Sequence, residues 1–254
     1  VFEPARVVEF FATSDGQAVL ANVAGIKVGS EGRPLPGGGE VELGAYDPVA
    51  DLILEDDRGF VRVAGREEVG VLLAKPWGPI DPTASIKRGV FAAGDIWIST
   101  EYVFWRDADG DFWLLGNRSG LIHTARGVVY PSPITDAVGA ISGVDLAATY
   151  PITVPGDTPA GSTPGDTEAG RTLAVTAITL RPGMNVTVAD LTDAVSRMPA
   201  GLPPDIVHVV HDLPLSASYR PTVSALRAAG LPKAGRNSWY LDADTGKYRR
   251  LTAA

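Results

Sequence analysis

The sequence predicts an α+β protein, in which a small antiparallel β-barrel or β-sheet region is followed by a small α/β-sandwich domain. Three observations support this fold class. Short apolar runs bounded by turn residues recur at a spacing of about 10 residues in the first half. Strand-like and helix-like periods alternate over the second half. A glycine-bounded stretch at residues 116–120 separates the halves, so we expect domains at residues 1–118 and 119–254.

The elements of the first half are marked mainly by turns. Residues 32–39, which carry two prolines and four glycines, and residues 56–59 have turn chemistry. Between and after them, alternating or apolar runs predict strands at 40–46, 60–64 and 69–74. Aromatic-rich runs at 97–105 and 111–115 predict a hairpin, since the Asp-Gly pair between them supplies the positive φ angles of a tight turn.

The second half mixes the two periods. Helical spacing of apolar residues predicts a helix at 134–141, and Thr187 with Asp190 has the pattern of a capping box at the start of another helix. We expect strands at 173–180 and 206–210 and a last helix at 221–229, closed by Gly230. The repeated Pro-Gly-Asp-Thr of residues 155–167 is expected to form a mobile loop.

Composition narrows the function classes. The net charge of −8 disfavours a nucleic-acid partner, and the absence of cysteine excludes disulfides and thiol nucleophiles. No apolar run approaches about 18 residues, so the sequence predicts a soluble, cytoplasmic protein. Because Val1 stands just before an expected strand at residues 6–11, we expect the chain to be the C-terminal part of a longer protein.

Four segments of the chain carry distinctive motifs. In order they are Glu9-Phe-Phe-Ala-Thr-Ser-Asp-Gly16, Gly89-Val-Phe-Ala-Ala-Gly-Asp95 with Asp107-Ala-Asp-Gly-Asp111, Leu115-Gly-Asn-Arg-Ser-Gly-Leu-Ile122 with Val129-Tyr-Pro131, and Leu213 to Arg227. These segments resemble motifs of the adenylate-forming acyl-CoA synthetases. The resemblance is greatest to the branch of very-long-chain acyl-CoA synthetases and fatty acid transport proteins, because Tyr219-Arg220 stands where that branch has Phe-Lys and because the tail carries Trp239-Tyr-Leu-Asp-x5-Tyr248.

The resemblance implies a reaction and its small molecules. ATP and a fatty acid would give an acyl-adenylate and pyrophosphate, and CoA would then take the acyl group. The implied cofactors are ATP or AMP, Mg²⁺ and CoA, and the implied partners are the fatty acid and the missing N-terminal part of the same protein. The family also leaves room for peripheral membrane contact by the full-length protein.

Site residues follow from the resemblance position by position. Phe11, Thr13 and Ser14 would contact the nucleotide, and Asp15 would hold the metal. Asp95 would bind the ribose hydroxyls, since a carboxylate can accept from both. Each of these segments could also be a plain polar turn.

The remaining positions lie in the second half or at its border. Arg118 would bind ribose or phosphate, although the family arginine aligns with Asn117 and alternation along a strand would turn its neighbour away. Gly116 and Gly120 would form the hinge. Arg126 stands in the family's glycine loop and would either contact the CoA phosphates or narrow the CoA tunnel. Arg220 would replace the catalytic lysine, which is not a conservative exchange.

Because several positions of this sequence differ from the family's motifs, two alternatives stay open. The chain is expected either to be the C-terminal fragment of a fatty acid-CoA ligase, inactive by itself, or to be a degenerate, non-catalytic protein that binds a nucleotide, acyl-CoA or a partner. The phosphate-wrapping loop of the family would lie before Val1, and Gly37-Gly-Gly39 does not replace it because no helix follows. His123, His208 and His211 lack metal-ligand spacing and are expected to be structural.

Overall fold

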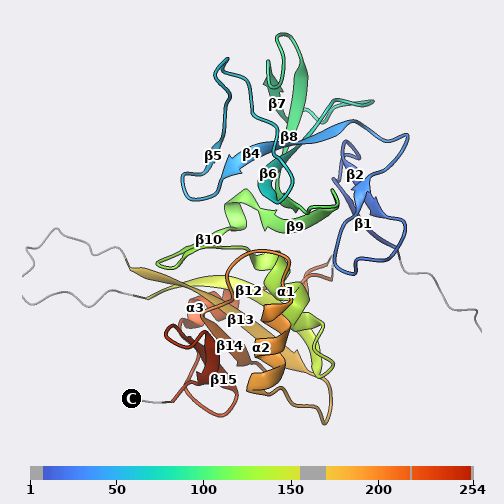
Figure 1. The fold of residues 1–254 in the computed structure, drawn as a ribbon. Coiled ribbons are helices and arrows are strands. Elements are labelled where there is room, and N and C mark those ends of the chain that lie inside the picture. Colours follow the sequence, from blue (N-terminus) through green and yellow to red (C-terminus); the bar gives the residue numbers. More distant parts are fainter. Residues whose placement is uncertain (1–7, 155–169, 218, 253–254) are drawn as a thin grey trace, which may run out of the picture. The chain divides into compact units, whose positions relative to one another are not determined.

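The computed structural model describes residues 8–154, 170–217 and 219–252, and the chain divides into two compact units at Gly120 (Figure 1). The first unit is Val1–Gly120 and the second is Leu121–Ala254. The Pro-Gly-Asp-Thr repeat and the first residues of the strand expected at 6–11 lie outside the described residues. No helix in the described ranges combines the length and the apolar character that crossing a membrane requires.

Antiparallel sheets build the first unit, which confirms the sheet predicted for this half. The larger sheet has the order β5-β4-β6-β8-β7, with β9 also paired to β8, and the smaller one has the order β1-β2-β3. The strands are β1 (Glu9–Ala12), β2 (Val19–Asn22), β3 (Arg33–Pro34), β4 (Val41–Asp47), β5 (Leu52–Ile53), β6 (Glu68–Ala74), β7 (Ser85–Arg88), β8 (Ile96–Arg106) and β9 (Phe112–Asn117). The run at 60–64 forms only isolated bridges.

The second unit is a five-stranded mixed sheet with the order β12-β13-β14-β15-β16. Strands β13 and β14 run parallel, and the other neighbours in this sheet are antiparallel. A short hairpin of β10 and β11 precedes it. The strands are β10 (Ile122–Thr124), β11 (Gly127–Val129), β12 (Val144–Val154), β13 (Arg171–Leu180), β14 (Ile206–Val209), β15 (Ser238–Asp242) and β16 (Lys247–Arg250).

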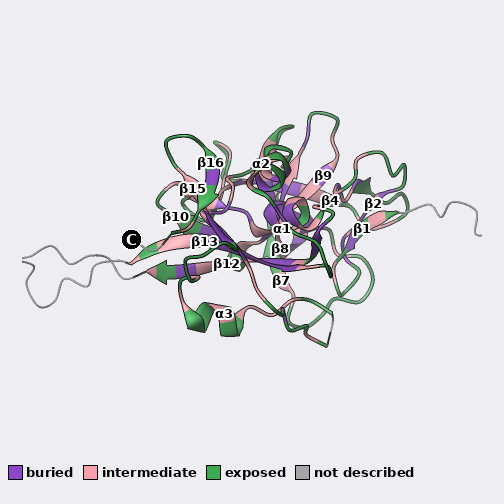
Figure 2. Ribbon diagram, turned by 90° about the horizontal axis from the view of Figure 1, so that it is seen from below, coloured by how far each residue is buried: buried purple, intermediate pink, exposed green. Residues whose placement is uncertain are grey.

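Three helices accompany this sheet: α1 (Pro131–Gly139), α2 (Val188–Ser196) and α3 (Ser224–Ala229). Alternation along the strands gives the sheet two apolar faces. Ala174, Ile178 and Val207 join the core that α1 and α2 cover, where Ile134 and Leu191 are fully buried. Figure 2 shows buried residues in purple along the strands of this sheet and on α1. The neighbouring strand residues face the core near α3. Helices on both faces of a mixed sheet confirm the predicted α/β sandwich.

Local chemistry explains where the helices begin. Pro131 opens α1, where a missing N–H costs nothing. Thr187 and Asp190 form the predicted capping box of α2, with both reciprocal hydrogen bonds present. Helix α3 begins three residues later than predicted, because Pro221 and Thr222 pair with the segment before them instead.

Candidate functional site

The first predicted site segment is the turn that follows β1. Phe11 is a core residue, packed edge to face on Tyr102 and Phe104 at centroid distances of 5.0 and 5.1 Å. Thr13 accepts a hydrogen bond from the Ala18 N–H at its hydroxyl oxygen (3.1 Å). Phe11 and Thr13 therefore hold the turn in place, and neither is exposed to solvent as Ser14 and Asp15 are.

Ser14 and Asp15 are exposed at the tip of this turn. One carboxylate oxygen of Asp15 accepts from the Gln17 N–H at 3.1 Å. Gly16 closes the turn with φ = 70°, a left-handed conformation that favours glycine. The turn therefore carries an exposed hydroxyl and an exposed carboxylate on adjacent residues. Mg²⁺ is usually held by one or two carboxylates together with water and phosphate oxygens, so Asp15 is suited to be one such ligand.

Asp95 organises the loop that runs into β8. Its carboxylate accepts hydrogen bonds from the backbone N–H groups of Val90 (2.6 Å), Phe91 (3.0 Å) and Ala92 (3.0 Å) and from the indole N–H of Trp97 (2.8 Å). Burial raises the pKa of Asp95, but together these donors lower it by more than burial raises it, so the net shift is downward. The carboxylate is ionised and already engaged by its own loop, and a ribose would have to share it.

Arg118 is held by carboxylates of its own unit. Its guanidinium contacts Asp51 at 2.8 and 3.0 Å and Glu101 at 3.2 Å, and it lies over the Tyr46 ring at 5.4 Å. Burial lowers its pKa, but the two carboxylates raise it more. Strand β9 ends at Asn117 and Arg118 starts a 3₁₀ turn, so strand alternation does not decide the direction of its side chain.

The two predicted hinge glycines differ in their surroundings. Gly116 lies inside β9, opposite Val103, with φ = 143°. Gly120 is the last residue of the 3₁₀ turn and of the first unit, and a Cβ placed there would meet nothing within 4 Å. The ladder constrains Gly116, whereas Gly120 has room to change conformation.

Arg126 and Arg220 both lie in the second unit. Arg126, in the turn between β10 and β11, donates to the Asp205 carboxylate (2.8 Å) and the Pro203 carbonyl oxygen (2.7 Å). Arg220 is exposed in a loop closed by the hydrogen bond from the Ser216 N–H to its carbonyl oxygen (2.8 Å). Its guanidinium has no hydrogen-bond or ion-pair partner within residues 8–154, 170–217 and 219–252. It is therefore available to an anionic ligand.

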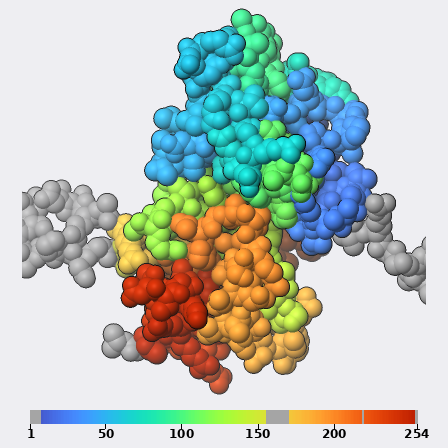
Figure 3. All heavy atoms as spheres, in the orientation of Figure 1, coloured from blue at the N-terminus to red at the C-terminus, as the bar shows by residue number. Residues whose placement is uncertain are grey.

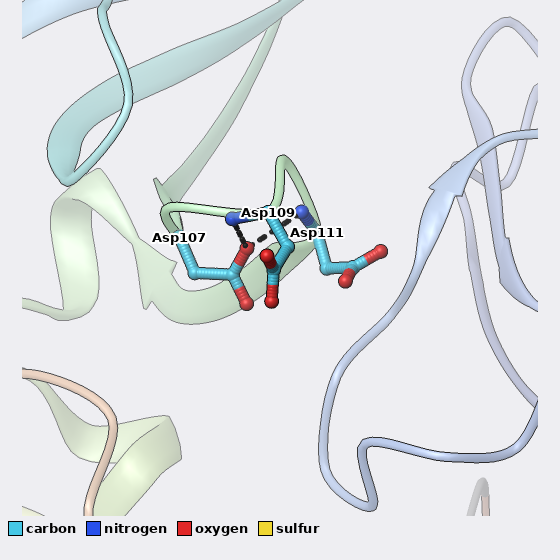
Figure 4. A group of neighbouring side chains, drawn as sticks. All are labelled: Asp107, Asp109 and Asp111. Carbon is cyan, nitrogen blue, oxygen red and sulfur yellow. Dashed lines mark hydrogen bonds between the residues drawn. The ribbon is translucent and has the colours of Figure 1, made fainter.

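The sequence prediction missed one polar cluster in the first unit. Asp107, Asp109 and Asp111 come from the turn between β8 and β9, and one carboxylate oxygen of each lies within 4.8 Å of the others (Figure 4). Asp107 accepts from the backbone N–H groups of Asp109 (3.0 Å) and Asp111 (2.9 Å). The Lys27 ammonium sits against all three carboxylates, at 2.6, 2.7 and 2.9 Å.

This cluster has an internal cation. Hydrogen bonds to the three carboxylates raise the pKa of Lys27. The spacing Asp-x-Asp-x-Asp was a signal in the sequence, and it indicates convergent carboxylates in a tight turn. Nothing local indicated that Lys27, 80 residues before Asp107, supplies the charge.

The predicted site residues thus fall into two groups, one in each unit. Asp15, Asp95 and Arg118 lie in the first unit, and each contacts its own neighbours there. Arg126 and Arg220 belong to the second unit. Within each unit the residues stand in turns and loops, where binding groups are commonly found.

Comparison with known proteins finds solved structures with a similar fold, and it shows how much of each chain the similarity covers. Neither a protein-family model nor a curated protein sequence matches the chain. Apo MatB from Rhodopseudomonas palustris is 20% identical with a TM-score of 0.60, over 89% of this chain and 41% of that one. O-succinylbenzoate coenzyme A synthetase (MenE) from Bacillus subtilis, in complex with AMP, is 19% identical with a TM-score of 0.56, over 91% and 42%.

A third solved structure, the anthranilate CoA ligase AuaEII in complex with anthranoyl-AMP, is 19% identical with a TM-score of 0.57 and is covered over 39% of its length. The chain therefore spans about two fifths of the length of the proteins it matches. At these identities the likeness concerns the fold. The chain has the fold of part of a coenzyme A synthetase and of part of a CoA ligase.

Proposed function

We propose that the chain is the C-terminal part of an acyl-CoA synthetase that activates a fatty acid through its adenylate. The observation that carries the proposal is the fold match over 88–91% of the chain to three proteins, of which two are described as a CoA synthetase and a CoA ligase. The four motif resemblances, in the same order along the chain, support it. The fatty acid substrate and the very-long-chain branch rest on the sequence resemblance, chiefly on Tyr219-Arg220.

Under this proposal the residues have separate roles. Ser14 and Asp15, exposed on a fixed turn, would face the phosphates and Mg²⁺, with Phe11 and Thr13 positioning that turn. Bound Mg²⁺ would neutralise phosphate charge. Asp95 would accept from the ribose, and Arg220 would stabilise negative charge at the reacting phosphate.

Two further assignments belong to the same proposal. Arg118 would reach the nucleotide and Arg126 the CoA phosphates only by exchanging carboxylate partners for the ligand. The pivot is assigned to Gly120 and not to Gly116, because the latter is paired within a strand. The full-length protein is placed in the cytoplasm, with peripheral membrane contact, and its N-terminal part would complete the site.

A second candidate function has an observation in its favour. Three of the predicted ligand-binding side chains are engaged within their own units: Asp95 by four donors, Arg118 by two carboxylates and Arg126 by Asp205. A protein that has lost catalysis could keep these contacts for stability alone. On this view the chain would bind a nucleotide or an acyl-CoA, or another protein, without turnover.

An exchange assay distinguishes the two candidates. The full-length protein is incubated with ATP, labelled pyrophosphate and a panel of fatty acids, and label appearing in ATP reports adenylation. We expect exchange by the native protein, a drop of about tenfold or more in Arg220→Ala from loss of a charge-assisted contact, and partial recovery in Arg220→Lys. Arg227→Ala is the matched control, because Arg227 is another exposed arginine of the same unit.

Each result of the exchange assay favours one candidate function and contradicts the other, or tests the role of Arg220. No exchange with any acid by the native protein refutes the enzyme and favours the non-catalytic candidate. Exchange that survives Arg220→Ala unchanged removes Arg220 from the reaction. The 254-residue chain alone, given ATP, CoA and the same acids, is expected to form no acyl-CoA.

A further inference from the structure

A pocket in the second unit is lined by none of the predicted site residues. It has a volume of about 370 Å³, toward the small end of the range for small-molecule sites. Its apolar floor includes Leu180, Val209 and Trp239, and its polar wall includes Asn185, Arg236 and Arg250. Trp239 belongs to the tail that resembles the very-long-chain branch, but the proposed reaction gives none of these residues a role.

The position of the pocket follows from the topology. Strands β13 and β14 are parallel neighbours, and the chain passes from one to the other through α2. Leu180 and Val209 are the last residues of these two strands, and both line the pocket, as do Thr187 and Val188 at the start of α2. In open α/β sheets, ligands bind in the crevice outside the carboxyl ends of parallel strands.

Arg250 is placed by the strand ladder. It lies directly opposite Trp239 across the antiparallel pair β15 and β16, so the two side chains point to the same face of the sheet. Trp239 belongs to the core beneath α1 and α2, and the surface of α2 (orange) lies beside that of the C-terminal strands (red) in Figure 3. The edge position of β16 lets the guanidinium of Arg250 reach solvent while its stem borders the pocket.

Arg236 comes from the loop before β15. The Gly235 N–H donates to the Leu251 carbonyl oxygen at 2.9 Å, which holds this loop beside the end of β16. Throughout the described part of the chain, neither Arg236 nor Arg250 has a hydrogen bond or ion pair at its guanidinium. Their neighbour Arg249 differs, because it pairs with Asp242 at 2.6 Å.

The nearby negative charge is already engaged. The Asp190 carboxylate accepts from the Thr187 N–H (2.8 Å) and hydroxyl (2.7 Å) in the capping box of α2. These donors lower its pKa. Among the described residues that line the pocket there is no carboxylate. Two guanidinium groups and the Asn185 amide therefore border a concave surface without a negatively charged group in its lining.

We propose that this pocket binds the phosphoryl group of a small phosphate-bearing molecule. Arginine matches phosphate geometry with two parallel hydrogen bonds, and a pair of arginines at the carboxyl edge of a β-α-β unit supplies both charge and direction. The apolar floor would accept the non-phosphate part of the ligand. The proposal is independent of the proposed ligase function, whose predicted residues lie elsewhere.

Binding is tested on the whole chain with two probes, inorganic pyrophosphate and ADP. The amide resonances of Asn185, Thr187, Arg236 and Asn237 are followed by two-dimensional NMR. We expect saturable shifts at these residues, and a loss of affinity of about tenfold or more in Arg236→Gln and in Arg250→Gln. Shifts with both probes identify the phosphate as the recognised group, and shifts with ADP alone add its nucleoside.

Lys247→Gln is the matched control. Lys247 is exposed on the same strand as Arg250 but does not line the pocket. Its substitution by Gln removes one positive charge, as Arg250→Gln does. We expect its affinity to change by less than about twofold. Four results would overturn the proposal: no saturable binding of either probe, an equal loss in Lys247→Gln and Arg250→Gln, binding only of a long polyanion such as an oligonucleotide, or shifts confined to residues 8–120.

Discussion

Replacing Asp107 by Asn removes one charge from the cluster that surrounds Lys27. The substitution keeps the shape of the side chain and an oxygen that can accept from the turn N–H groups. It loses the ionised partner of Lys27, at 2.6 Å, and the acceptor of the Trp113 indole N–H, at 3.0 Å. We expect Asp107→Asn to destabilise the first unit.

The pKa of Asp107 gives the size of the effect. Burial raises this pKa, but Lys27, Trp113 and the Asp111 N–H lower it more, so that it falls from 3.8 to about 2. A shift of nearly two units corresponds to ~2.5 kcal/mol. Because the folded-state pKa lies below the unfolded one, this stabilisation is fully present above about pH 4 and is lost as the pH falls through 2. About half of it remains at pH 3.

Urea unfolding followed by tryptophan emission measures this effect, because Trp77, Trp97, Trp105 and Trp113 are in the first unit and only Trp239 is in the second. The free-energy difference between the native chain and Asp107→Asn is expected to be ~2.5 kcal/mol at pH 7 and about half of that at pH 3. Asp109→Asn is the control, because the Asp109 side chain is 71% exposed and its pair with Lys27 is expected to add little. The reasoning is refuted if Asp107→Asn costs the same at both pH values, or if Asp109→Asn costs as much.

Two further predictions concern a glycine and a histidine. Gly32 and Gly37 both have left-handed φ angles, 75° and 84°, but a Cβ on Gly32 would lie 2.1 Å from the Ala21 carbonyl oxygen, while one on Gly37 meets nothing within 4 Å. Gly32→Ala should therefore cost on the order of 2 kcal/mol more than Gly37→Ala in urea unfolding, and equal costs would contradict the clash. Burial lowers the pKa of His208 to about 4, and its ring nitrogen contacts the Tyr150 hydroxyl at 2.9 Å. The second unit should lose stability as the pH falls from 6.5 toward 4, by up to ~3 kcal/mol, and the same decline in His208→Gln would exclude this cause.

Features with local signals were predicted well from the sequence. The hairpin of β8 and β9 was indicated by its Asp-Gly turn, and the start of α2 by Thr187 and Asp190, and both are present. Strand β12 was missed because it contains Pro151, which usually argues against a strand. The structure explains the exception, since β12 is an edge strand of its sheet.

Long-range partners could not be read from the sequence. Arg118 was predicted to contact a ligand, and the structure gives it Asp51, 67 residues away. Lys27 had no predicted role, and its three aspartates are 80 or more residues away. Sequence patterns report spacing along one element, whereas ion pairs between loops depend on how the sheets bring those loops together. The pocket beside Arg236 and Arg250 was missed for the same reason.

The sheet of the second unit is completed late during synthesis, because its strands β15 and β16 lie near the end of the sequence. Its core beneath α1 and α2 includes Trp239 and Tyr248, which are 4% and 2% exposed. The Tyr248 hydroxyl donates to the Pro204 carbonyl oxygen at 2.9 Å, just before β14. When residues up to 209 have left the ribosome, β12, β13, α2 and β14 are available to fold. The strand that pairs with the other edge of β14, which is β15, has not yet emerged. Until β15 and β16 emerge, that edge can pair with another chain. A stop codon before Trp239 would make this exposed state permanent, so we expect such truncations to aggregate instead of folding into a smaller domain.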